Sequence, residues 1–185
     1  MDTCFVDLTV EFLAVAFHSI LYYTAVYPAG IFETRRKYNV VVYRSIHPEV
    51  NQYIDLCLKS IAECLSNGCL SRIEFALTDS NYKSLFKFIF DIEKIDQFDE
   101  TKDAYLIEVE QNLRAFCLKL PSLSERVKDL PEDCSFSIYI HTDESTAVNM
   151  ACNVDLEGVK EFCTYVNNRL RLFYVLDLAL ITFIA

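Results

Sequence analysis

The first 26 residues constrain the fold most, because their apolar side chains recur at helical spacing on two sides at once. One side carries Val6, Val10, Leu13, Phe17 and Ile20, and the other carries Phe5, Leu8, Phe12, Val15, Tyr22 and Val26. A helix that is apolar nearly all round is covered by other elements on several faces. Asp7, Glu11 and His18 interrupt the run, which therefore falls short of the roughly 20 apolar residues of a membrane span. The sequence predicts a central core helix.

The later patterns alternate between helical and strand periods. Tyr27 to Gly30 ends the first helix, a short β-type run follows over 40–43, and a second helix is expected from His47-Pro48 to Asn67-Gly68. Residues 73–77 and 86–92 alternate as a hairpin, residues 106–120 predict a third helix that stops at Pro121, and residues 136–140 predict a further strand. We expect an α+β fold, with three helices on one face of a largely antiparallel sheet.

Composition narrows the functional classes. The formal charge of −10 over 185 residues repels phosphate backbones, so direct nucleic-acid binding is not expected. Three scattered glycines cannot form a Gly-rich phosphate loop, and the acidic N-terminus is a poor signal peptide, which favours an intracellular chain that is not anchored to a membrane. The eight cysteines lie in apolar stretches and are interpreted as reduced, buried side chains.

Catalytic and metal-binding patterns are missing from the sequence. The three histidines have no HExxH or GxSxG context, and Cys57, Cys64 and Cys69 lack zinc-ligand spacing. Arg35-Arg36-Lys37 could form a phosphate patch, but in an acidic chain a solvated turn or a small protein-binding patch is the better interpretation. We expect no catalytic residue, metal or cofactor. An enzyme would need a triad or a metal cluster that the sequence does not display.

Several strings resemble one family. They are Val26-Tyr27-Pro28-Ala29-Gly30-Ile31-Phe32, Arg36-Lys37-Tyr38-Asn39-Val40, His47-Pro48-Glu49-Val50-Asn51-Gln52-Tyr53-Ile54, Leu113-Arg114-Ala115-Phe116 and Ile140-His141-Thr142. Together they resemble the HORMA-domain accessory subunits of DNA polymerase zeta, which are relatives of the spindle-checkpoint HORMA proteins. The resemblance spans roughly residues 5 to 150, in register with the predicted elements.

The resemblance implies a noncatalytic nuclear adaptor, also present in the cytoplasm, that captures an extended peptide of the polymerase's catalytic subunit. In the family the peptide adds a strand to a sheet edge while a C-terminal "seatbelt" segment wraps around it. The matching edge is Cys134 to Thr142. The implied peptide-binding residues are Tyr27, Tyr53, Phe136, Ile138, Tyr139 and Ile140, and Arg114 matches an arginine of the HORMA–HORMA dimer contact.

The resemblance weakens after Met150. We therefore expect a HORMA core over residues 1–150 and an atypical or truncated seatbelt over 151–185, where the family's tryptophan is missing because the chain has none. This departure puts the family's contact with the scaffold polymerase of translesion synthesis in question, and it predicts faster dissociation of a captured peptide. The alternative function is a cell-cycle regulator, a spindle-checkpoint-like HORMA protein that captures peptides of mitotic activators.

Overall fold

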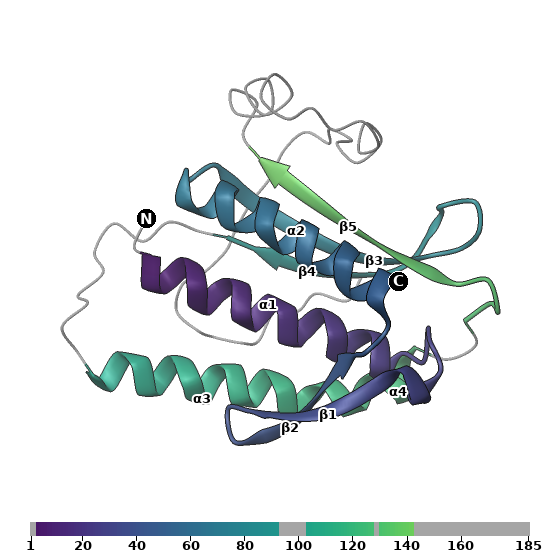
Figure 1. Cartoon of the computed structure of the whole chain (residues 1–185), viewed down its shortest axis with the longest axis horizontal. Helices are drawn as coiled ribbons and strands as arrows, with labels where there is room; N and C mark the ends of the chain where they lie inside the picture. The colour runs from purple at the N-terminus through teal and green to yellow at the C-terminus, as the bar shows by residue number, and fades with distance from the viewer. Residues whose placement is uncertain (1–2, 93–102, 128–129, 143–185) are drawn as a thin grey trace.

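The computed structural model describes residues 3–92, 103–127 and 130–142 (Figure 1). The predicted seatbelt segment 151–185, and the boundary proposed at residue 150, lie outside these residues. The element order is helix, hairpin, helix, hairpin, helix and strand, and every paired strand is antiparallel. The predicted α+β class is confirmed.

Helix α1, Thr3–Tyr23, is the centre of the molecule. It runs between α2, Pro48–Ser66, and α3, Asp103–Lys119, and lies against the sheet (Figure 1). Phe17 is fully buried and stacks on Phe75 of the sheet, with ring centroids 5.2 Å apart, while Phe12 meets Phe116 of α3 edge-on at 4.9 Å. The length and composition of α1 would also suit a membrane-spanning helix. Its contacts with the sheet and with α3 confirm the prediction of a core helix.

A hairpin covers the C-terminal half of α1. Strands β1, Phe32–Lys37, and β2, Val40–Ser45, pair antiparallel, and the rings of Tyr22 and Tyr43 stack at 3.4 Å. The sequence predicted only the second strand and placed the basic triplet 35–37 in a turn. The turn instead consists of Tyr38 and Asn39, both with positive φ, as a two-residue hairpin loop requires.

The three-stranded sheet has the order β4-β3-β5, formed by Leu70–Thr78 as β3, Ser84–Asp91 as β4 and Ser135–Thr142 as β5. Phe75 lies opposite Phe88 on β4 and opposite Ile138 on β5, which sets one apolar face toward the helices. Helix α2 begins at Pro48 and is followed by Asn67 and by Gly68 with φ of 66°, so its predicted ends are confirmed. The predicted hairpin and final strand are confirmed as well.

The segment after α3 differs from the prediction. Proline 121 ends the α-helix, but the chain continues as a 3-10 turn, Leu120–Ser122, and a short helix α4, Leu123–Arg126, where a polar loop was expected. Leu120 and Leu123 are buried in the core. Two apolar residues among polar neighbours are too few to display a helical period, which explains why the sequence did not reveal this turn.

Candidate functional site

The outer edge of β5 has a defined set of outward backbone groups. The Ile138 amide donates to the Tyr53 hydroxyl at 3.2 Å and so points away from β3. Since backbone direction alternates along a strand, the amides and carbonyls of Phe136 and Ile140 face the same outer edge. Within the part of the chain that the structure describes, no strand pairs with this edge.

An aromatic cluster lines the inner side of this edge. Phe136 stacks on Phe75 at 5.2 Å and receives Tyr53 edge-on at 5.3 Å and Tyr27 edge-on at 6.1 Å. Tyr53 lies on α2, whereas Tyr27 lies in the turn that follows the end of α1. The structure therefore brings three of the predicted residues, Tyr27, Tyr53 and Phe136, together at the edge.

The Tyr53 hydroxyl joins α2 to the β5 edge. It accepts from the Ile138 amide, and the Cys57 thiol, one helical turn further along α2, is close enough to influence its pKa. Burial raises the pKa of Tyr53 well above its ordinary value, and burial raises the pKa of the Cys57 thiol to about 11. Both groups are consequently neutral at physiological pH, and they offer hydrogen bonds rather than charge. From sequence, Cys57 was interpreted only as part of the apolar face of the second helix. Its position four residues after Tyr53 on a helix could have indicated that the two side chains are neighbours.

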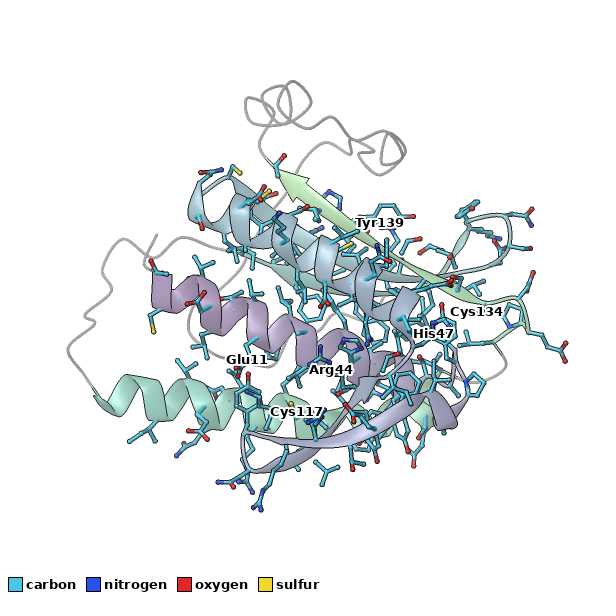
Figure 2. The ribbon with its side chains drawn as sticks, viewed as in Figure 1. Glu11, Arg44, His47, Cys117, Cys134 and Tyr139 are labelled. Carbon is cyan, nitrogen blue, oxygen red and sulfur yellow. The ribbon has the colours of Figure 1, made fainter. Side chains whose placement is uncertain are left out.

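The remaining predicted residues of β5 contribute differently. Ile138 is buried and Ile140 half-buried against the core, so their backbones, not their side chains, are presented at the edge. Tyr139 alternates to the opposite face of the sheet, and its partner across the ladder is Glu74 of β3. Figure 2 shows Tyr139 on the strand, and the structure does not bring it into the aromatic cluster.

The basic triplet forms a paired surface on β1. Arg35 forms an ion pair with Glu33 at 2.6 Å, and Lys37 forms one with Glu11 of α1 at 2.8 Å. The triplet lines a groove of about 570 Å³ between α1 and the hairpin, in which Glu11 is also a wall. Because acidic side chains already neutralise two of the three cations, this surface does not favour a phosphate ligand.

Arg114 lies away from the β5 edge. It is exposed on α3, between the exposed side chains of Ile107 and Leu118 on the same helix face. An exposed arginine flanked by exposed apolar residues is a typical composition for a protein contact surface.

The described residues contain no group of three or more His, Cys, Asp or Glu that could hold a metal ion. Of the six cysteines that the structure describes, Cys64, Cys69 and Cys117 are buried, as the sequence predicted, whereas Cys57 and Cys134 are half-buried and Cys4 is exposed. The site is therefore built from a backbone edge and aromatic rings, which is the chemistry of peptide recognition.

A fold of this kind, with a sheet edge beside α2 that no described strand pairs with, defines a class of peptide-capturing domains. The model of the HORMA domain matches residues 6–154, and the chain belongs to the HORMA-domain family. The predicted resemblance is thereby confirmed.

The relatives carry two kinds of name. The human "Mitotic spindle assembly checkpoint protein MAD2B" is 37% identical over 156 residues, which cover 84% of this chain and 72% of the human protein. The Drosophila melanogaster "DNA polymerase zeta subunit 2" is 30% identical over 146 residues, covering 78% and 73%. The Arabidopsis thaliana "DNA polymerase zeta processivity subunit" is 32% identical over 132 residues, covering 70% and 59%.

Solved structures share the fold. A chain of the "Crystal Structure of Mitotic Checkpoint Complex" aligns with a TM-score of 0.68 and 22% identity over 75% of each chain. Caenorhabditis elegans HTP-2, in a structure described as bound to a HIM-3 closure motif, aligns with a TM-score of 0.60 and 13% identity over 75% of this chain and 69% of that one. At these identities the likeness concerns the fold alone.

Proposed function

We propose that this chain is a noncatalytic peptide-binding adaptor, the accessory subunit of the translesion DNA polymerase zeta, which holds the catalytic subunit of that polymerase. The observation that carries the proposal is the outer edge of β5, unpaired by any described strand, with Tyr27, Tyr53 and Phe136 beside it. The names of the fly and plant relatives support the choice of polymerase.

The edge suits an extended guest peptide. Three successive outward positions, Phe136, Ile138 and Ile140, provide backbone donors and acceptors for an added strand. Tyrosines offer large contact area with little loss of side-chain freedom, so Tyr27 and Tyr53 are suited to select the guest's side chains. The net charge of −10 supports an association with DNA that passes through the polymerase rather than through this chain.

Two further contacts belong to the proposal. The exposed face of α3 around Arg114, with Ile107 and Leu118, is proposed as the surface for a HORMA homodimer or heterodimer. A contact with the scaffold translesion polymerase would fall on the C-terminal segment, outside the described residues. A polymerase subunit acts on nuclear DNA, which supports a nuclear location; the proposal adds a cytoplasmic pool.

The second candidate is a cell-cycle regulator that captures mitotic-activator peptides. The name of the human relative, a mitotic spindle assembly checkpoint protein, favours it. The same edge would serve both functions, so the guest's sequence, and not the mode of attachment, separates them.

Isothermal titration of the full chain tests the proposal. A proline-containing peptide from the polymerase zeta catalytic subunit is titrated in parallel with a mitotic-activator peptide of equal length. We expect tighter binding of the polymerase peptide, and loss of affinity in Tyr53→Ala but not in Tyr82→Ala, which truncates a tyrosine that is 78% exposed on the β3–β4 turn. Preference for the activator peptide would support the second candidate, and binding of neither peptide would overturn both.

A further inference from the structure

The middle outward amide of the β5 edge is already occupied in the unbound chain. Of the three outward positions, Phe136, Ile138 and Ile140, the central one donates to Tyr53, a residue 85 positions away in the sequence. An added antiparallel strand would place its own carbonyl at this amide. The guest and the Tyr53 hydroxyl therefore compete for one donor.

The Tyr53 hydroxyl and the Tyr53 ring meet different neighbours. The neighbouring Cys57 thiol lies on α2 itself, so its electrostatic influence on the hydroxyl does not depend on β5. The Tyr53 ring is held separately, by its edge-on contact with Phe136 at 5.3 Å. Ring and hydroxyl thus have different surroundings, and their contributions can be separated by substitution.

We propose that the Tyr53 hydroxyl is a gate on the β5 edge: it closes the Ile138 amide in the unbound chain, and a guest strand pairs fully only after its carbonyl replaces that hydroxyl. The proposal rests on the proposed function, since it assumes that this edge receives a strand. A guest that cannot place a backbone carbonyl opposite Ile138 forms no hydrogen bond in exchange for the one to Tyr53, and it therefore binds more weakly. The closed amide also protects an edge that would otherwise be a template for unspecific strand pairing.

The first test needs no guest. Amide-resolved hydrogen exchange by NMR compares the full-length wild type with Tyr53→Phe, which keeps the ring and removes the hydroxyl. We expect the Ile138 amide to exchange about fivefold faster in Tyr53→Phe, the factor typical of one lost hydrogen bond. The control is Tyr38→Phe, which removes a hydroxyl that donates to Glu11 at 3.4 Å in the β1–β2 hairpin and should leave Ile138 unchanged. Equal Ile138 exchange in wild type and Tyr53→Phe would overturn the gate.

The second test measures capture of the polymerase-derived peptide by isothermal titration. Tyr53→Phe should bind roughly fivefold more tightly, because the competitor is gone and the ring remains, whereas Tyr53→Ala should bind more weakly. Unchanged affinity in Tyr53→Phe would mean that the hydroxyl has no effect on binding. Affinity that falls as far as in Tyr53→Ala would mean that the hydroxyl contacts the guest. Either result would overturn the gate. A wild type that binds no peptide would overturn the proposed function and the gating role together, whereas equal amide exchange would overturn the gate alone.

Discussion

Phe136 contacts both the core and the tyrosines of the candidate site. Its replacement by alanine therefore measures how much these contacts contribute to the free energy of unfolding. Full burial of a phenylalanine makes its replacement by alanine cost about 3 to 5 kcal/mol. Phe136 is half-buried, but it forms ring contacts with Phe75, Tyr53 and Tyr27. Aromatic pairs add about 0.5 to 1.5 kcal/mol each beyond buried area. We therefore expect Phe136→Ala to lower the free energy of unfolding by about 2 to 3 kcal/mol.

Urea denaturation of the full chain, followed by circular dichroism, measures this loss. With a slope of about 2 kcal/mol per molar urea, the midpoint should fall by about 1 M at constant slope. A double-mutant cycle with Tyr53→Ala isolates the Tyr53–Phe136 pair, for which we expect a coupling of about 1 kcal/mol. A loss below about 1 kcal/mol in Phe136→Ala, or a coupling near zero, would refute the inference that Phe136 holds the tyrosines at the edge.

Three further predictions concern Tyr53, Arg114 and His18. Tyr53→Ala should weaken peptide capture by about 1 to 3 kcal/mol in a chain that still folds, less stable by at least the contact with Phe136, and unchanged affinity in isothermal titration would remove Tyr53 from the site. Arg114→Ala should lower self-association in analytical ultracentrifugation and leave peptide affinity intact; sedimentation identical to the wild type would count against a dimer contact on α3. Burial, reinforced by nearby Arg44, lowers the pKa of His18 from 6.5 to about 4, so the folded chain favours the neutral imidazole. Its contribution to stability is fully present above about pH 6.5 and is lost as pH falls from there towards about 4, at up to about 1.4 kcal/mol per pH unit. The free energy of unfolding, measured by denaturation at several pH values, should fall more steeply with decreasing pH in the wild type than in His18→Gln. The same pH dependence in both would contradict the prediction.

The elements with strong periodicity were predictable from sequence. The two-sided apolar pattern of α1 and the alternation in β3, β4 and β5 indicate buried faces, and the structure places Phe17, Phe75 and Phe88 in one core. Proline 48 at the start of α2 and Gly68 after its end mark backbone conformations that these residues adopt readily. These signals are local, and they need no knowledge of the tertiary contacts.

The elements without an apolar face were not predictable in this way. Strand β1 carries Arg35, Arg36 and Lys37 toward solvent, and it is fixed by pairing with β2 and by the contact of Lys37 with Glu11, which lies 26 positions earlier in the chain. The closed Ile138 amide likewise depends on Tyr53 from a distant helix. A single sequence shows a tyrosine next to an apolar stripe, but only the fold shows which backbone group its hydroxyl meets.

The central position of α1 has a consequence for synthesis. This helix leaves the ribosome before the other described elements, and three of its ring partners, Phe75, Phe90 and Phe116, come much later in the chain. At about 5 to 20 residues per second, the roughly 100 residues between Phe17 and Phe116 take about 5 to 20 s to translate. During that interval the most apolar segment of the nascent chain lacks its native cover, which makes it a natural client for chaperones that bind apolar helices at the ribosome exit.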